Sequence, residues 1–105
     1  MIITLTDQTV KDYWKGPSAK DFLILDFWSP RCEGCRFNAS LLEEVVKEFP
    51  KNLDVAKVNV EFNPFIVAEH DIRLFPSLAL FHSGKFIGKI SGVPSREQLL
   101  KTLGI

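Results

Sequence analysis

Runs of apolar residues without helical spacing mark four candidate strands along the chain. Residues 22–28, FLILDFW, are apolar except for one aspartate and are followed by Pro30, which predicts a strand buried on both faces. Residues 53–60 are rich in β-branched residues and alternate in polarity, as strands do. Residues 77–82 and 86–90 flank the turn SGK, so they predict a β-hairpin.

Apolar residues at helical spacing predict two helices in the first half of the chain. Thr6 or Asp7 is the expected N-cap of the first helix, TDQTVKDYWK, which the segment GPSAKD ends. The second helix starts at Gly34 and ends before Pro50. Its apolar face is expected to comprise Phe37, Leu41, Leu42, Val45, Val46 and Phe49.

Capping residues predict two shorter helices in the second half. Asn63 as the cap and Pro64 in the first turn open a helix over roughly residues 63–70. Ser95 and Gln98 form a capping-box pattern ahead of the final helix, SREQLLKTL. The resulting order is α-β-α-β-α-β-β-α, and a short extra N-terminal strand is compatible with it. Right-handed crossovers between the early strands imply parallel pairing. We therefore expect an α/β fold, with a mixed central sheet and helices on both of its faces.

Length and charge narrow the classes of function. With 105 residues, the chain is expected to form a single domain, 1–105, around one core. Its 13 basic and 13 acidic residues give a formal net charge of +0, which argues against binding nucleic acid or membrane surfaces through bulk charge. No apolar run reaches the length of a membrane span. The start, MIITLTDQTV, lacks the features of a secretory signal, so we expect a cytoplasmic location.

The two cysteines of the chain, Cys32 and Cys35, lie in DFWSPRCEGCRF, between a predicted strand and a predicted helix. At the start of that helix, unpaired backbone N–H groups and the helix dipole would lower the pKa of the Cys32 thiol and favour its reactive thiolate. Cys35, one turn later, can close a disulfide with Cys32. The pair can then exchange two electrons with the disulfide of another protein.

Two other interpretations of the cysteines are weaker. The neighbouring residues are polar, which argues against two inert thiols in a core. A structural zinc site needs four ligands, and the two histidines, His70 and His82, do not stand at metal-ligand spacing. We therefore expect redox chemistry, without a bound cofactor or metal.

Asp26 interrupts the apolar strand FLILDFW. Burial would raise the pKa of its carboxyl group, and a buried base near Cys35 could accept the proton that this thiol must lose. The alternative is that Asp26 meets solvent or a lysine at the end of the strand, and we favour the proton acceptor. Lys57 either moderates the burial of Asp26 or is an exposed strand lysine, and the sequence favours neither.

Pro76 stands directly before the strand SLALFH. A trans proline at a strand start is the common case. A cis bond is the rarer alternative, and the residues themselves do not decide between the two.

Taken together, these segments resemble the thioredoxin family over nearly the full chain. The resemblance rests on ILDFW, C-x-x-C-R, DVAKVNV, IRLFPSLALF, and GK and SG before a closing helix. It implies the thioredoxin fold, a central mixed sheet flanked by four helices. It also implies that Cys32 is the attacking thiolate, that Cys35 is the resolving thiol, and that Asp26 is the buried acid that serves Cys35.

The same resemblance implies a substrate site around the cysteines. Pro76 is then cis and packs against the disulfide, and the backbone at Phe75 pairs with the bound substrate. Gly92 leaves room for that substrate, and Trp28 packs beneath the active-site loop.

The chain departs from the family segment W-C-G-P-C in three residues. Arg31 replaces an aromatic residue of the substrate-facing surface, and Glu33 and Gly34 replace the Gly-Pro pair. Ser40 also replaces a proline that kinks the helix, so we expect a straighter helix. Glu33 opposes a thiolate whereas the neighbouring arginines favour it, and exposure would screen these charges. We expect Arg31, Glu33 and Gly34 to affect redox potential and partner choice.

The expected function is that of a monomeric thiol–disulfide oxidoreductase that reduces protein disulfides. Its partners would be disulfide-containing client proteins and a thioredoxin reductase, of undetermined type, to which any flavin or iron–sulfur cofactor belongs. The alternatives are a thiol oxidase or disulfide isomerase, and a non-catalytic binding module. A buried Asp26 argues against the former, and the combination of Cys32, Cys35, Asp26 and Pro76 against the latter.

Overall fold

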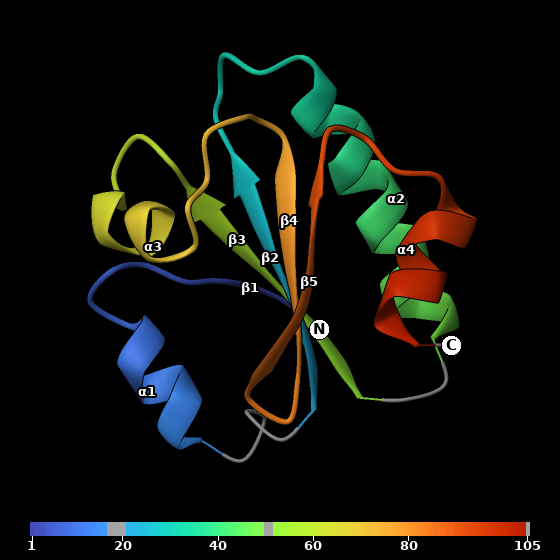
Figure 1. Cartoon of the computed structure of the whole chain (residues 1–105), viewed down its shortest axis with the longest axis horizontal. Coiled ribbons are helices and arrows are strands. Elements are labelled where there is room, and N and C mark those ends of the chain that lie inside the picture. The colour runs from blue at the N-terminus through green and yellow to red at the C-terminus, as the bar shows by residue number, and fades with distance from the viewer. Residues whose placement is uncertain (17–20, 50–51, 105) are drawn as a thin grey trace.

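The computed structural model describes residues 1–16, 21–49 and 52–104, and in these ranges five strands form one mixed sheet (Figure 1). The strands lie in the order β1-β3-β2-β4-β5. β1 and β2 pair parallel with β3, whereas β4 pairs antiparallel with β2 and β5. Their bounds are Ile2–Thr4 for β1, Phe22–Trp28 for β2, Leu53–Asn59 for β3, Ser77–His82 for β4 and Lys85–Ser91 for β5.

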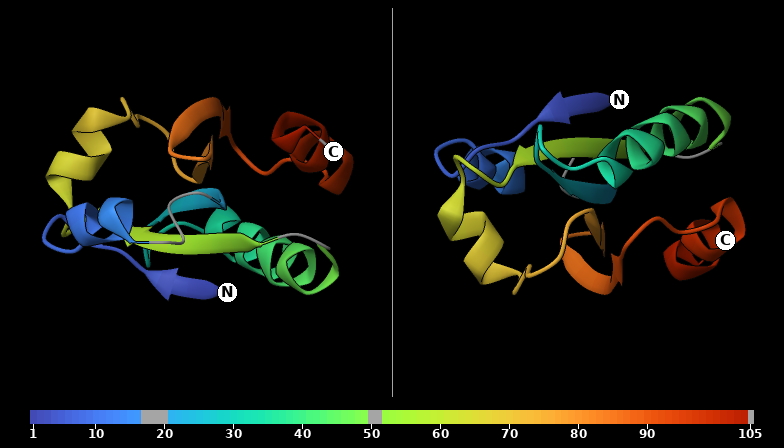
Figure 2. Two further views of the ribbon diagram at one scale, coloured as in Figure 1. Left: turned by 90° about the horizontal axis from the view of Figure 1, so that it is seen from below. Right: turned by 90° about the horizontal axis from the view of Figure 1, so that it is seen from above.

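Four helices in the described ranges cover the two faces of this sheet (Figures 1 and 2). They are α1 (Val10–Lys15), α2 (Gly34–Glu48), α3 (Pro64–Glu69) and α4 (Arg96–Leu103). Residues of α1 and α3 pack on one face, and residues of α2 and α4 on the other. The predicted element order is confirmed, with β1 as the extra N-terminal strand. None of these helices is long and apolar enough to cross a membrane.

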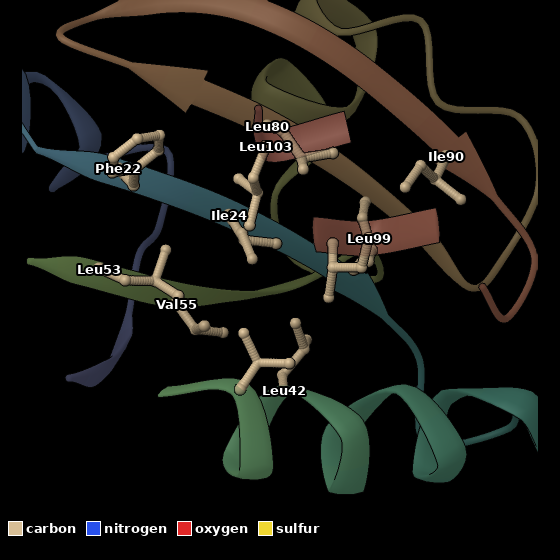
Figure 3. Packing of buried hydrophobic residues seen from close by; sticks show 11 residues of the cluster. Phe22, Ile24, Leu42, Leu53, Val55, Leu80, Ile90, Leu99 and Leu103 are labelled. Carbon is tan, nitrogen blue, oxygen red and sulfur yellow. The ribbon is translucent and has the colours of Figure 1, made fainter. Parts of the chain in front are cut away.

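β2 lies in the middle of the sheet and is buried on both faces, as its sequence predicts. Ile24 belongs to the core on the α2 and α4 side, where Leu42 and Leu99 reach toward the sheet (Figure 3). Phe27 belongs to the core on the α1 and α3 side. Because side chains alternate along a strand, Asp26 continues the row of Ile24 on the α2 face.

The first helix begins later than predicted. α1 starts at Val10 and its N-cap is Thr9, so the expectation of Thr6 or Asp7 as the cap is wrong. The hydroxyl of Thr6 accepts hydrogen bonds from the backbone N–H groups of Gln8 and Thr9, each 3.2 Å long. These bonds stabilise a turn ahead of the helix, which is an alternative that threonine side chains offer to the backbone.

Asp7 instead caps α3, which is distant in sequence. Its carboxylate accepts hydrogen bonds from the backbone N–H groups of Phe65 (3.2 Å) and Ile66 (3.0 Å). Asn63 occupies the N-cap position as predicted, but its side chain makes no capping bond. Its Oδ1 accepts a 2.9 Å hydrogen bond from the N–H of Asp7, and its Nδ2 donates a 2.8 Å bond to the carbonyl of Asn59.

α2 is one continuous helix, and its core-facing side agrees with the predicted one at five of six residues: Leu42 and Val45 are buried, and Leu41, Val46 and Phe49 pack against the core. Phe37 is 67% exposed, whereas Asn38, which the prediction left out, is completely buried. The buried residues Cys35, Asn38, Leu42 and Val45 follow the helical period. The prediction is wrong only at the start of the helix, where it took the apolar Phe37 as inward-facing and left out the polar Asn38. The predicted end of the helix at Pro50 lies outside the described residues.

The C-terminal predictions hold. β4 and β5 form the expected hairpin. Ser95 caps α4, since its hydroxyl accepts a 3.1 Å hydrogen bond from the N–H of Gln98. The end of β5 and the start of β4 lie side by side, because Ser77 pairs with Ser91, and Ser77 also pairs with Phe27 of β2. One end of the sheet, at the top of Figure 1, therefore gathers the segments that follow β2, precede β4 and follow β5.

Candidate active site

The cysteine pair lies where β2 ends and α2 begins. Cys32 and Cys35 form a disulfide with their Cα atoms 5.4 Å apart. Cys32 is half-buried, whereas Cys35 lies inside the first turn of α2 and is only 6% exposed. The backbone N–H of Cys35 donates a 3.2 Å hydrogen bond to Sγ of Cys32. The helix start thus directs an N–H donor at Sγ of Cys32, an arrangement that stabilises negative charge on that atom.

A cavity of about 350 Å³ opens beside the two sulfurs. Its lining includes both cysteines as well as Asp26 and Lys57. Asp26 is 1% exposed, and its Oδ1 has no hydrogen-bond partner among the described residues. Burial raises the pKa of its carboxyl group from 3.8 to about 6, and the charge of Lys57 limits this rise. Asp26 is therefore a weak acid that can hold or release a proton near neutral pH.

Lys57 is the direct neighbour of Asp26 across the β2–β3 pair. Its Nζ lies 5.4 Å from the centre of the Trp28 ring, so the ammonium group also faces an aromatic surface. Lys57 is half-buried, and its charge opposes the rise that burial causes in the pKa of Asp26. Trp28 itself is half-buried and lines the cavity beside the cysteines.

A polar network orders the loop before Cys32. The guanidinium of Arg31 lies 3.5 Å from the carboxylate of Glu61, although Arg31 is 86% exposed. The hydroxyl of Ser29 donates a 2.8 Å hydrogen bond to the same carboxylate and accepts a 3.2 Å bond from the N–H of Arg31. Sequence reasoning missed Ser29 and Glu61, which are 32 residues apart, and no local pattern links them. Glu33 is exposed at the rim of the cavity.

The opposite wall of the site comes from the segment before β4. The Phe75–Pro76 peptide bond is cis, as the family resemblance implies. Pro76 is buried, and Phe75 is 44% exposed. A Cβ on Gly34 would lie only 3.1 Å from Cδ of Pro76 and 3.5 Å from a methyl group of Val93. At Gly34, which has no side chain, the start of α2 therefore packs directly against the segment before β4 and the segment after β5.

Gly92 connects this wall to the segment after β5. Its N–H donates a 2.8 Å hydrogen bond to the carbonyl of Pro76, and its φ is +85°, a region that favours glycine. Apart from Gly92 and its two chain neighbours, no atom of the described residues lies within 4 Å of the position that a Cβ would take, so the space beside Gly92 is open. Asn38, missed by the sequence reasoning, donates a 3.4 Å hydrogen bond from Nδ2 to the carbonyl of Gly92. Its regular spacing from Cys35 and Leu42 is the signal that could have found it.

The histidines lie apart from the cysteines. His70 is half-buried against Phe27 and Phe81, and burial is the largest cause that lowers its pKa. His82 is exposed, with its ring stacked on Phe22. Among the residues that the structure describes, no cluster of three or more His, Cys, Asp or Glu side chains could hold a metal ion.

Comparison with known proteins agrees with this geometry. The thioredoxin family model matches residues 2–104. The thioredoxin of Buchnera aphidicola subsp. Baizongia pistaciae is 34% identical over 104 residues, which is 99% of this chain and 94% of that protein. The thioredoxin of Griffithsia pacifica is 37% identical over 81 residues, covering 77% of this chain and 74% of that protein.

A solved structure is similar in fold. The X-ray structure of Fasciola hepatica thioredoxin superposes with a TM-score of 0.83, covering 98% of this chain and 96% of that one, at 24% identity. This likeness confirms the predicted fold, a mixed five-stranded sheet with four helices in the described ranges. Family membership and the C-x-x-C disulfide together favour an oxidoreductase over the non-catalytic binding module. The chain belongs to the thioredoxin family and is a thiol–disulfide oxidoreductase, a reductase of protein disulfides.

Proposed function

We propose that Cys32 attacks the disulfide of a client protein and that Cys35 resolves the mixed disulfide. The observation that carries this assignment is the asymmetry of the pair. Cys32 is the more exposed sulfur and accepts the N–H of Cys35, whereas Cys35 is buried at 6% exposure. A reachable, electrostatically favoured thiolate suits the attacking role, and an enclosed thiol suits the second step.

The proposed reaction moves two electrons from the dithiol to the client. The Cys32 thiolate bonds one client sulfur, and the client S–S bond breaks to release the other sulfur as a thiolate that takes up a proton. Cys35 then loses its proton and attacks Sγ of Cys32. This forms the Cys32–Cys35 disulfide and releases the second client sulfur, so the client is reduced and the protein is oxidised.

Asp26 is proposed as the acceptor of the Cys35 proton. Asp26 and Cys35 line the same cavity, and the cavity is large enough for water to connect them. Burial places the pKa of Asp26 near 6, within reach of a proton transfer at neutral pH. Lys57, which lines the same cavity, would tune this pKa rather than exchange a proton itself.

The client is proposed to lie along the backbone at Phe75, which is 44% exposed, beside the buried Pro76. Its segment would extend over the open space beside Gly92, and Gly34 would allow the close approach. Trp28 would support the loop from below. Arg31 and Glu33, both exposed at the rim, would contact charged residues of the client or reductase.

For its biological setting, residues 1–105 are proposed to act as a single, monomeric domain in the cytoplasm. Electrons would come from a thioredoxin reductase that carries its own cofactor. The clients are proteins whose disulfides an exposed thiolate can reach.

Trapping with serine variants tests the two cysteine roles. Cys35→Ser should accumulate mixed disulfides with insulin, because the second step is blocked. Cys32→Ser should form no mixed disulfide beyond the slow background reaction of the buried Cys35 thiol. Non-reducing gels and mass spectrometry would identify the adducts, with the wild-type protein reducing insulin in parallel. Equal trapping by the two variants would contradict the assignment of roles.

A further inference from the structure

Asn38 is a polar residue at a position where an apolar one would be expected. It lies three residues after Cys35 on the inner face of α2, between Cys35 and Leu42, and is 0% exposed. Its Oδ1 has no hydrogen-bond partner among the described residues. A buried acceptor without a partner loses its hydration without compensation, so a leucine here would favour folding more. Stability therefore does not explain this asparagine.

The other end of the amide links two parts of the active site. Nδ2 of Asn38 donates to the carbonyl of Gly92 over 3.4 Å, and the N–H of Gly92 donates to the carbonyl of Pro76 over 2.8 Å. The peptide groups on either side of Gly92 are thus fixed from two directions. A continuous chain of contacts runs from the helix that carries Cys35, through Gly92, to the residue beside which the client is proposed to lie.

Gly34 explains why such a link is needed in this chain. The start of α2 meets Pro76 and Val93 at Gly34, which has no side chain to fix the spacing. Glycine also leaves the backbone at the helix start freer than other residues would. The Asn38–Gly92 bond, one turn deeper, supplies a directional contact between the same two parts of the molecule.

From these contacts we propose that Asn38 is a positioning residue for the reduction of protein disulfides. It fixes the segment of Gly92 and Val93, and through Gly92 the Pro76 carbonyl, relative to Sγ of Cys32. It touches no reacting atom. This inference rests on the proposed client site at Phe75, Pro76 and Gly92. A protein client that pairs with that backbone depends on the spacing, whereas a small disulfide that only needs to reach Sγ does not.

The test compares two substrates in Asn38→Leu and Asn38→Ala. The pre-reduced proteins are mixed with insulin and, separately, with 5,5′-dithiobis(2-nitrobenzoate), and the second-order rate constants are measured. We expect the ratio of the insulin rate to the small-disulfide rate to fall about 2- to 10-fold in both variants, the range that loss of one neutral hydrogen bond gives. Urea unfolding should show that Asn38→Leu is at least as stable as the wild type.

Leu42→Val is the matched control, because Leu42 is the next buried residue on the same helix face and its apolar side chain cannot donate a hydrogen bond to Gly92. It should lower stability and leave the rate ratio unchanged. A rate ratio that stays unchanged in both Asn38 variants would overturn the proposal, whether neither rate falls or both rates fall by the same factor. If the wild-type protein reduced insulin but the Cys35→Ser variant trapped no client, the proposed function would fail instead, independently of Asn38.

Discussion

Asp26→Asn removes an ionisable group from the cavity beside the disulfide while nearly preserving the shape of the side chain. Burial raises the pKa of Asp26 from 3.8 to about 6. The folded protein thus binds this proton more tightly than the unfolded chain does. The gap between the two pKa values corresponds to about 3 kcal/mol, at about 1.36 kcal/mol for each pH unit. Ionised Asp26 therefore destabilises the fold.

The sign of the pH dependence follows from this difference. The contribution of Asp26 to the free energy of unfolding is fully present below pH 3.8 and is lost as pH rises to about 6. Asparagine does not titrate. The variant should therefore match the wild type near pH 3.5 and exceed it by about 3 kcal/mol at pH 7.5.

Urea unfolding of the oxidised proteins at pH 3.5, 5 and 7.5 measures this difference without interference from the thiols, which do not titrate in the disulfide. Glu44→Gln, which removes an exposed carboxylate from α2, is the control and should show no comparable gain. The reasoning would be refuted by a gain of equal size at every pH, or by a loss of stability at pH 7.5.

The same variant also addresses proton transfer. If Asp26 accepts the Cys35 proton, Asp26→Asn should slow the resolution of a preformed mixed disulfide at pH 7, and the slowing should diminish at higher pH as Cys35 ionises by itself. The initial attack by Cys32 should change less. Stopped-flow measurement of the two steps separates these effects, and equal slowing of both steps would argue against the proposed role.

Three further predictions concern the rim of the site. Gly92→Ala and Gly104→Ala should each lower stability by about 1–2 kcal/mol in urea unfolding, because both glycines have φ near +85° and open space beside Cα. Only Gly92→Ala should also slow insulin reduction, and equal activities would contradict the client site. Arg31→Ala should change stability by less than about 1 kcal/mol. It should slow reduction of an acidic disulfide peptide more than of a basic one, with a difference that shrinks as salt increases, and a salt-independent loss would count against a charge effect. Exchanging Glu33 and Gly34 for Gly-Pro should alter the rate with the native reductase more than with dithiothreitol, whereas similar changes with both reductants would exclude a role in partner choice.

The sequence predicts the elements of this protein well because their signals are local. The apolar run around Asp26, the capping pattern at Ser95 and the turn between β4 and β5 each depend on neighbours within a few residues. The cysteine spacing between a strand and a helix likewise predicts a disulfide at a helix start. Asp26 could be predicted as buried because it interrupts a strand whose neighbours are apolar on both faces.

Contacts between distant segments could not be predicted in this way. Asp7 caps α3 because the fold brings residues 58 and 59 positions further along the chain to its carboxylate. Glu61 meets Ser29 across the end of the sheet for the same reason. Neither contact leaves a periodic signal in the sequence, since each depends on how separate elements pack.

The sequence by itself therefore determined the strands, the helices, the paired thiols and the acid inside the apolar strand, because backbone propensity and burial periodicity act over short distances. The tertiary structure decided which side chains face one another. It exposed Phe37, buried Asn38 against Gly92 and brought Pro76 beside Gly34. These contacts join segments more than 40 residues apart, and only packing the helices on the twisted sheet brings such segments together.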